Sequence, residues 1–273
     1  MKILKTISQL RMVRAGVGDL GLVPTMGFLH AGHLSLVARA RAENPTVAAT
    51  IFVNPTQFGP NEDLARYPRD MPRDLALLEA AGCDLVFAPE PADIYPAGFD
   101  TVVEVRGVTE GLEGAVRPGH FAGVATVVAK LFNIVQPTRA YFGQKDAQQS
   151  VVIRKMVRDL NLPVEVVVAP TVREVDGLAM SSRNSYLTPE QRAEAPALFR
   201  ALSAAKAAYD AGERDAEALR AAMRSELDGF AVDYVSVADA ETLRELNRID
   251  GPALASLAAR LGTTRLIDNL PLD

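Results

Sequence analysis

The sequence contains a single cysteine, Cys83, and no run of lysine and arginine. One cysteine excludes an internal disulfide and any metal site built from several cysteines. Cys83 lies in an apolar run that ends at Ala88, which favours a buried structural thiol over a nucleophile. Acidic residues outnumber basic ones by 34 to 29, so the formal net charge is −5. This balance argues against a nucleic-acid or membrane-surface partner but still permits a small anionic ligand.

Long apolar stretches are absent as well, and none approaches the length that crosses a membrane. The amino terminus, MKILKTISQLRMVRAG, alternates apolar and polar residues and lacks the apolar core and cleavage site of a signal peptide. We therefore expect a cytoplasmic protein. Its 273 residues, 48% hydrophobic and 23% charged, suit a globular chain of one large or two ordinary domains.

Up to about Pro170, short apolar runs alternate with helix-patterned segments. Strands are expected at Gly21–Pro24, Val47–Asn54, Asp84–Ala88, Ala140–Phe142 and Val164–Ala169, and helices at Leu34–Ala42, Arg69–Ala81, Ala122–Ile134 and Ala147–Leu160. The alternation predicts an α/β fold with a Rossmann-like, doubly wound parallel sheet. Ligands of such sheets bind at the carboxyl ends of the strands, near the switch in strand order, so the loops there are the first candidates for function.

The sequence after about Pro170 has a different pattern of expected helices and strands. Thr188-Pro189-Glu190-Gln191 has the form of a capped helix start, and the sequence stays alanine-rich and helical up to Arg224. Short strands are expected at Val232–Val237 and Thr264–Ile267, around a helix near Pro252–Leu261. We therefore expect two domains, residues 1–171 and a smaller α+β domain at 172–273.

The segment from Pro24 to His33, PTMGFLHAGH, follows an expected strand and leads into an expected helix. Gly27 and Gly32 allow a ligand to approach the backbone, and amides at a helix start attract phosphate. His30 and His33 are three residues apart, so one helical turn places both rings on one side. Beside a triphosphate, two imidazoles donate hydrogen bonds and stabilise the leaving pyrophosphate.

The alternative interpretation of these histidines is that they only cap or pack the first helical turn. We favour a function, because two of the three histidines of the chain stand at this spacing in a glycine-bearing loop. A zinc pair is a weaker option, since no third ligand is nearby. An HxGH motif after a first strand resembles the nucleotidyltransferase superfamily, whose members attack the α-phosphate of a nucleotide. The motif alone leaves the substrate open.

Further polar residues follow other expected strands. Asn54 and Gln57 supply neutral donors and acceptors suited to a hydroxy acid, although Asn-Pro is also a plain turn signal. Arg117 can pair with a phosphate or carboxylate, but a solvated loop arginine is commoner, and a lone histidine such as His120 is more often structural. In GQKDAQQ, Lys145 is the natural cation for a nucleotide phosphate.

Near Lys145, Asp146 either caps the next helix or holds ribose or magnesium, and Gln149 lies one helical turn further on. The stretch Met180–Asn184 combines two hydroxyls, backbone amides and a guanidinium, which suits a mobile phosphate clamp. A polar interdomain linker is the plainer interpretation of that stretch.

Together these segments resemble the pantothenate synthetase family from about Val23 to Asn269. The resemblance is carried by PTMGxLHxGH, FVNPxQF, ARYPR, LEGxxRPGHF, FGxKDxQQ, GLAxSSRN and RLIDN. It implies ATP-dependent condensation of (R)-pantoate with β-alanine through a pantoyl adenylate, releasing AMP and pyrophosphate. It also implies a Mg²⁺ ion with the ATP cosubstrate, a homodimer, a domain 1–171 that binds ATP and pantoate, and a domain 172–273 that closes over the active site.

The resemblance also implies residue roles. His33, His30 and Lys145 would be catalytic. The expected ATP-binding residues are Met26, Gly27, His30, His33, Gly143, Lys145, Asp146, Val172, Met180, Ser181, Ser182 and Arg183. Gln57 and Gln149 would hold pantoate, and Asn54, Tyr67, Glu113 and Arg117 would lie near the substrates or a covering flap. Ala31 and Gln144 depart from the acidic residues that other members often carry, so the local charge differs. No protein metal site is expected.

Two other functions stay open. One is a different HxGH nucleotidyltransferase, which would stop at a stable nucleotide conjugate. The other is a nucleotide-sensing protein without turnover, although the presence of His33 and Lys145 argues against it. A tRNA synthetase is disfavoured, because the chain is acidic and shows no RNA-binding extension.

Overall fold

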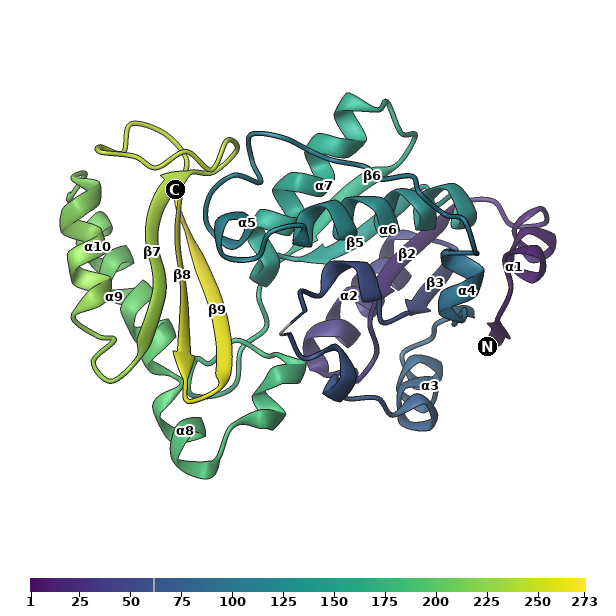
Figure 1. Cartoon of the computed structure of the whole chain (residues 1–273), viewed down its shortest axis with the longest axis horizontal. Coiled ribbons are helices and arrows are strands. Elements are labelled where there is room, and N and C mark those ends of the chain that lie inside the picture. Colours follow the sequence, from purple (N-terminus) through teal and green to yellow (C-terminus); the bar gives the residue numbers. More distant parts are fainter. Residues whose placement is uncertain (61) are drawn as a thin grey trace. The chain divides into compact units, whose positions relative to one another are not determined.

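The computed structural model describes residues 1–60 and 62–273, and Figure 1 shows the arrangement of their helices and strands. A six-stranded parallel sheet has the order β1-β4-β3-β2-β5-β6, and a three-stranded antiparallel sheet has the order β7-β8-β9. The strands are β1 Lys2–Leu4, β2 Leu20–Thr25, β3 Thr46–Ile51, β4 Leu85–Phe87, β5 Arg139–Gly143, β6 Glu165–Ala169, β7 Ala231–Asp239, β8 Ala253–Leu261 and β9 Thr264–Leu272.

The α-helices are α1 Ile7–Arg14, α2 Ala31–Glu43, α3 Met71–Ala80, α4 Pro91–Ile94, α5 Glu113–Val116, α6 His120–Val135, α7 Ala147–Asp159, α8 Pro189–Glu194, α9 Ala197–Asp210 and α10 Ala216–Arg224. Short 3-10 helices are η1 Pro55–Gln57, η2 Leu64–Arg66, η3 Gln144–Asp146 and η4 Ser182–Tyr186. None of the helices in the described ranges is long and apolar enough to span a bilayer.

The chain divides into two compact units. The first comprises Met1–Arg106, Arg117–Gly143 and Val152–Pro170, and the second comprises Gly107–Val116, Gln144–Val151 and Thr171–Asp273. The long final segment of the second unit starts beside the expected domain boundary. Two short segments from the 1–171 stretch also belong to this unit, because their polar groups bond within it, as described below.

The parallel sheet of the first unit is doubly wound, which confirms the predicted fold class. From β2, the order runs to β3 and β4 on one side and to β5 and β6 on the other. α2 and α3 pack on one face, over a core that includes Val23, Leu36, Val47, Leu78 and Val86. The switch in strand order therefore lies at β2 and β5, where ligands of such sheets bind.

The edge strand β1 is a feature that the sequence analysis did not predict. Its three residues pair in parallel with Leu85–Phe87 of β4. Only Leu4 is buried, while Lys2 and Ile3 are exposed. A strand this short gains its order from the ladder to β4 and carries too few alternating residues to be recognised from its own pattern.

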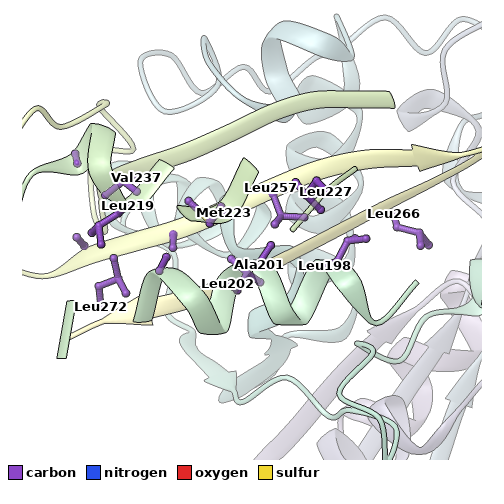
Figure 2. Close-up of a cluster of buried hydrophobic side chains, with 14 of the residues drawn as sticks. Leu198, Ala201, Leu202, Leu219, Met223, Leu227, Val237, Leu257, Leu266 and Leu272 are labelled. Atoms are coloured by element: carbon purple, nitrogen blue, oxygen red, sulfur yellow. The ribbon is translucent and has the colours of Figure 1, made fainter. Parts of the chain in front are cut away.

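In the second unit, the predicted helix near Pro252–Leu261 is wrong, because Ala253–Leu261 forms β8, the central strand of the antiparallel sheet. The alanines favour a helix locally, but ladders to β7 and β9 outweigh that propensity. Ala253, Ala255, Leu257 and Leu261 alternate onto the hydrophobic core, at the strand period of two. Figure 2 shows Leu257 in this core beside side chains of α9 and α10.

The capped helix start predicted at Thr188 is confirmed. Thr188 is the N-cap of α8, its side chain accepts from the Gln191 backbone amide, and Gln191 bonds back to the Thr188 amide. The helical stretch up to Arg224 is divided among α8, α9 and α10. Apolar residues of α9 and α10, among them Leu198, Leu202, Leu219 and Met223, cover one face of the antiparallel sheet.

Candidate active site

The turn from β2 into α2 carries the first group of candidate residues. Gly27 and Phe28 both have positive φ, at 84° and 50°, so the chain reverses sharply at the end of β2. A Cβ on Gly27 would also lie 3.0 Å from a carboxylate oxygen of Asp74, so both conformation and space require glycine there. The backbone then extends at His30, which is the N-cap of α2.

His30 and His33 form a capping box with imidazoles in place of the usual hydroxyl and carboxylate. His30 Nδ1 accepts from the Gly32 amide at 3.1 Å, and His33 Nδ1 accepts from the His30 amide at 3.3 Å. Because an accepting Nδ1 carries a lone pair, the proton of each neutral ring lies on Nε2. The ring centroids are 4.1 Å apart, so the predicted placement of both rings on one side is confirmed.

Asp74, which the sequence analysis did not single out, holds this turn in place. Its side chain is 1% exposed and accepts from the backbone amides of Phe28 at 2.6 Å and Leu29 at 2.8 Å. Asp74 lies in the first turn of α3, with the Arg73 guanidinium 3.9 Å away. The signal that could have identified Asp74 in the sequence is an acidic residue one helical turn before Leu78, on the buried face of α3.

Asn54 and Gln57 are brought together with Met26 in the first unit. Asn54 is the N-cap of η1, so the expected turn exists, and its side chain is also almost fully buried. Asn54 Nδ2 donates to Gln57 Oε1 at 3.0 Å, and Gln57 Nε2 donates to Met26 Sδ at 3.3 Å. Tyr95, a second unpredicted residue, donates to Asn54 Oδ1 at 2.8 Å. The Gln57 amide is therefore held by neighbours on both sides.

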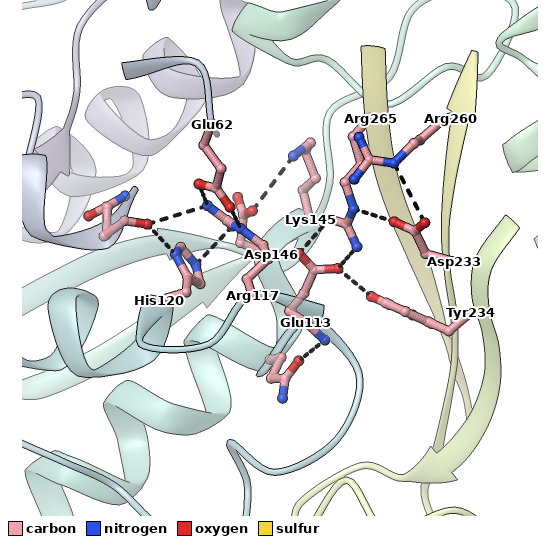
Figure 3. Close-up of polar contacts among 12 residues, drawn as sticks. Glu62, Glu113, Arg117, His120, Lys145, Asp146, Asp233, Tyr234, Arg260 and Arg265 are labelled. Atoms are coloured by element: carbon pink, nitrogen blue, oxygen red, sulfur yellow. Dashed lines mark hydrogen bonds and ion pairs between the residues drawn. The ribbon is translucent and has the colours of Figure 1, made fainter. Parts of the chain in front are cut away.

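Arg117 and His120 support the backbone of the same segment. Figure 3 shows Arg117 beside Glu62 and His120, and its guanidinium makes two 2.7 Å bonds to the Glu62 carboxylate. His120 Nδ1 lies 2.9 Å from the Gln57 carbonyl and its Nε2 lies 3.1 Å from Arg117. Because Arg117 can only donate, His120 donates from Nδ1 to Gln57. Burial raises the pKa of Glu62, but the bonds from Arg117 lower the pKa further, to below its ordinary value.

The second unit contains a buried charge network around Glu113, also visible in Figure 3. Arg265 donates two 2.7 Å bonds to the Glu113 carboxylate, and the Tyr234 hydroxyl donates a third at 3.0 Å. Burial and the negative Glu113 raise the pKa of Tyr234, so its hydroxyl stays a donor. The Gln148 side chain accepts from the Glu113 amide and donates to Val108 and Gly111. These bonds explain why 107–116 and 144–151 belong to this unit.

Lys145 lies on η3 in the second unit, with its side chain 20% exposed and its Nζ 3.6 Å from an Asp146 oxygen. The backbone of this turn is held by Asn269 of β9, whose Nδ2 donates to the carbonyls of Gln144 and Lys145, each at 2.9 Å. Gln144 returns a bond from its own amide to Asn269 Oδ1 at 3.0 Å. Asn269 belongs to RLIDN, a motif that the resemblance contained without a role for this residue.

Val172 and Met180 face each other across a tight hairpin, in which the Met180 amide donates to the Val172 carbonyl at 3.0 Å. Ser181 follows as the N-cap of η4, and its hydroxyl accepts from the Arg183 amide at 3.2 Å. Ser182 is buried and Arg183 lies in η4. The candidate clamp is thus a capped turn in the second unit.

The remaining candidates are placed as follows. Gly143 ends β5, and a Cβ built on it meets no described atom within 4 Å. Gln149 is half-buried in the first part of α7, which belongs to the second unit. Tyr67 is 6% exposed in the first unit, with its ring edge-on to Phe58. Within residues 1–60 and 62–273, no group of three or more histidine, cysteine, aspartate or glutamate side chains has the geometry of a metal site.

Comparison with known proteins identifies relatives along the whole chain. Pantothenate synthetase of Herpetosiphon aurantiacus is 67% identical over 274 residues, covering 99% of each protein. The structure of pantothenate synthetase from Thermus thermophilus superposes with a TM-score of 0.95 at 54% identity, covering 99% of each chain. Pantoate-beta-alanine ligase from Francisella tularensis, solved with Beta-gamma ATP and beta-alanine, has a TM-score of 0.82 at 35% identity, covering 99% of this chain and 97% of that one.

The family comparison agrees with these relatives. The family model described as Pantoate-beta-alanine ligase matches residues 2–271, which is nearly the whole sequence. On this match and on the identities above, the chain belongs to the pantoate-beta-alanine ligase family.

Proposed function

We propose that this chain condenses (R)-pantoate with β-alanine to pantothenate at the expense of ATP, through a pantoyl adenylate, releasing AMP and pyrophosphate. The family match over residues 2–271 carries this proposal. The Francisella relative, solved with Beta-gamma ATP and beta-alanine, supports the choice of substrates. The capping box of two imidazoles supports a nucleotide as the first substrate.

The reaction has two steps. A carboxylate oxygen of pantoate attacks the α-phosphorus of ATP, and the bond from that phosphorus to the bridging oxygen breaks as pyrophosphate leaves. The neutral amine of β-alanine then attacks the pantoyl carbonyl, AMP leaves, and the amine proton passes to solvent. Activation is needed because a carboxylate is a poor acyl donor. No covalent bond to the protein forms, so the chain contributes chiefly position and charge.

His30 and His33 have the chemistry for the first step. With both Nδ1 atoms accepting backbone hydrogen bonds, Nε2–H of each ring is a donor for phosphate oxygens. Such donors offset the charge that develops on the departing pyrophosphate. In this proposal Lys145 supplies a full positive charge to the phosphates, and the capped Ser181–Arg183 turn supplies hydroxyl, amide and guanidinium donors.

Gln57 has the chemistry for pantoate, in this proposal together with Gln149. Its side-chain amide is held between Asn54 and Met26, which leaves little freedom in its orientation. A fixed amide donates to a carboxylate and accepts from a hydroxyl, and pantoate carries both groups. Gly143 suits a nearby ligand, because no described side chain occupies the space at its Cβ position.

Mg²⁺ fits this chain as an ion that accompanies ATP, since the described residues offer no preformed cage and Mg²⁺ is commonly held by one or two carboxylates plus substrate phosphates. Asp146, beside Lys145, is the carboxylate we assign to it. When bound, the ion neutralises phosphate charge.

We also propose that the chain forms a homodimer and that it lies in the cytoplasm. Light scattering after gel filtration tests the homodimer, and cell fractionation tests the location. The closure of the 172–273 domain over the active site stays a prediction.

The proposal is tested by incubating the purified chain with ATP, Mg²⁺ and pantoate, with and without β-alanine, and identifying the products by mass spectrometry. We expect pantothenate and AMP only in the complete mixture, and pantoyl adenylate without β-alanine. His33→Ala is expected to lose adenylate formation while staying folded. A stable nucleotide conjugate with another acceptor would favour a different nucleotidyltransferase, and ATP binding without any product would favour the sensor.

A further inference from the structure

Asp268 and Asn269 are two adjacent polar residues in the middle of β9, and each is only 3% exposed. Neighbouring residues of a strand point to opposite faces of its sheet. Asp268 is in register with Leu257, which faces the helical core, and Asn269 is in register with Ser256 on the other face. One short stretch of a buried strand therefore reaches two different segments of the second unit.

The Asn269 side chain hydrogen-bonds to the turn that bears Lys145. Its two amide hydrogens reach the Gln144 and Lys145 carbonyls, and its oxygen takes the Gln144 side-chain amide. An aspartate in its place would present an oxygen to two carbonyl oxygens, and an alanine would leave both carbonyls without this donor. The direction in which Lys145 leaves the backbone is thus set by Asn269.

Asp268 is committed to Arg173. Its carboxylate takes two guanidinium bonds, at 2.6 and 3.0 Å, and the backbone amide of Asn269 at 2.8 Å. Arg173 also donates to the Gly177 carbonyl at 3.0 Å and stacks over the Phe199 ring at 4.1 Å. Arg173 is thereby fixed inside the hairpin that joins Val172 to Met180, directly before the Ser181–Arg183 turn.

We infer that Asp268 and Asn269 are positioning residues for the nucleotide: Asn269 sets the Lys145 turn, and Asp268 sets the Val172–Met180 hairpin through Arg173. This inference rests on the proposed function, which assigns those two segments to ATP. Adjacent positions on one buried strand keep the two segments in a constant relation within their unit. A displacement of about 1 Å at such groups is enough to slow a reaction on the order of a hundredfold.

The test compares the wild-type chain with Asn269→Ala and, as a matched control, Ser256→Ala. Ser256 is the cross-strand neighbour of Asn269, is 5% exposed, and its hydroxyl bonds no described residue. Three quantities are measured: the affinity for a non-hydrolysable ATP analogue by calorimetry, the single-turnover rate of pantoyl adenylate formation, and the rate at which accumulated adenylate reacts with β-alanine. Circular dichroism confirms folding.

We expect Asn269→Ala to weaken analogue binding and to slow adenylate formation, each by about tenfold or more, because Lys145 is misplaced. The reaction of the adenylate with β-alanine should change by less than about twofold, since that step does not need the triphosphate. Ser256→Ala should match the wild type. A folded Asn269→Ala chain with wild-type affinity and adenylate rate, or with equal losses in both steps, overturns the inference.

A second variant covers the case in which Asn269→Ala does not fold. Arg173→Lys keeps a cation for Asp268 but loses the paired bonds and the contact to Gly177. Analogue affinity is expected to fall severalfold, and an unchanged affinity overturns the inference. If the wild-type chain binds the analogue but forms no adenylate, the proposed function fails and the affinities alone decide the inference. A wild-type chain that does not bind the analogue overturns both.

Discussion

At the scale of single residues, the β2–α2 turn depends on the Asp74 carboxylate, which accepts from two successive amides of a segment with positive φ. Both oxygens are used, so the position requires two acceptors. Neutral asparagine has only one side-chain oxygen, and its NH₂ group would face the second amide. An unsatisfied buried donor costs about 1–3 kcal/mol. The histidine capping box begins at the next residue, so its position follows from that of the turn.

Asp74→Asn is therefore expected to stay folded but to form pantoyl adenylate more than about tenfold more slowly, because the histidines shift relative to the phosphates. Asp70→Asn is the control, since the Asp70 side chain caps the same helix by accepting from the Arg73 amide. Asparagine keeps one side-chain oxygen for this cap, so Asp70→Asn should keep both its stability and its rate. Single-turnover kinetics of pantoyl adenylate formation test this prediction. Equal rates for the two variants would contradict the role of Asp74.

Glu62 makes the stability of the folded chain depend on pH. Its pKa in the folded chain lies below the ordinary 4.5, so its bond to Arg117 contributes fully above that value and is lost as the pH falls through the lowered pKa. Glu62→Gln should be less stable than wild type by roughly 1 kcal/mol at pH 7. This gap should narrow below pH 4.5.

The prediction for Glu62 is tested by measuring the urea midpoints of the wild-type chain and of Glu62→Gln at several pH values. Asp210→Asn, which breaks the exposed pair with Lys206, serves as the control and should change the midpoint little at any pH. A Glu62→Gln gap that stays constant down to the acid range would show that the charge of Glu62 is not its source.

At the scale of elements, α6 lies against η1 with no room for a side chain at Gly123. A Cβ there would be 2.4 Å from the Thr56 carbonyl oxygen and 2.7 Å from the Gln57 nitrogen, both of them backbone atoms. Asn54 also donates to the Gly123 carbonyl at 3.2 Å. The close approach of helix and turn is thus part of what places Asn54 and Gln57.

Gly123→Ala should destabilise the chain by about 1–3 kcal/mol, because overpacking outweighs the gain of up to about 1 kcal/mol from alanine in a helix. It should also raise the KM for pantoate more than the KM for ATP, since Gln57 moves. Gly18→Ala is the control, as its Cβ meets no described atom within 4 Å. The prediction is tested by measuring the urea midpoint and the KM values for pantoate and ATP. Unchanged values would contradict it, because they would mean that α6 moves away from η1 without loss of stability.

The antiparallel sheet shows how one element serves two purposes. One face of β8 and β9 supports the helical core, while Arg265 and Asn269 on the other face bond the segments 107–116 and 144–151. The small side chains of β8 suit a central strand covered on both sides. The same alanines misled the prediction from local propensity.

At the scale of the whole molecule, the candidate nucleotide residues are divided between the two compact units. Met26–His33 belongs to the first unit, and Gln144–Asp146 and Ser181–Arg183 belong to the second. A ligand that binds only the folded chain stabilises it by about 2.7 kcal/mol at a hundred times its Kd. Amides that open locally are protected when the ligand contacts their segment.

Saturating ATP is therefore expected to slow hydrogen exchange in all three of these segments. Exchange followed by mass spectrometry tests this, with the helix α1, which carries no candidate residue, as the internal reference. Protection confined to one unit would contradict the assignment of the candidates in the other.

Much of the fold of the first unit could be predicted from local sequence patterns. The β2–α2 turn was predicted because glycine, histidine spacing and an apolar strand are short-range signals, and α2, α3, α6 and α7 were predicted from their apolar periodicity. The parallel sheet followed, since alternating strands and helices have few allowed topologies. The ordered set of motifs indicated the family.

The residues that hold those motifs in place were revealed only by the tertiary structure. Asp74, Tyr95, Asp268 and Asn269 act on segments distant in the sequence, and no local pattern states which segments meet. The strand identity of Ala253–Leu261 was decided in the same way, by ladders to two neighbours that outweigh the propensity of alanine. Local composition sets what a segment can become, and long-range hydrogen bonds and burial select among those choices.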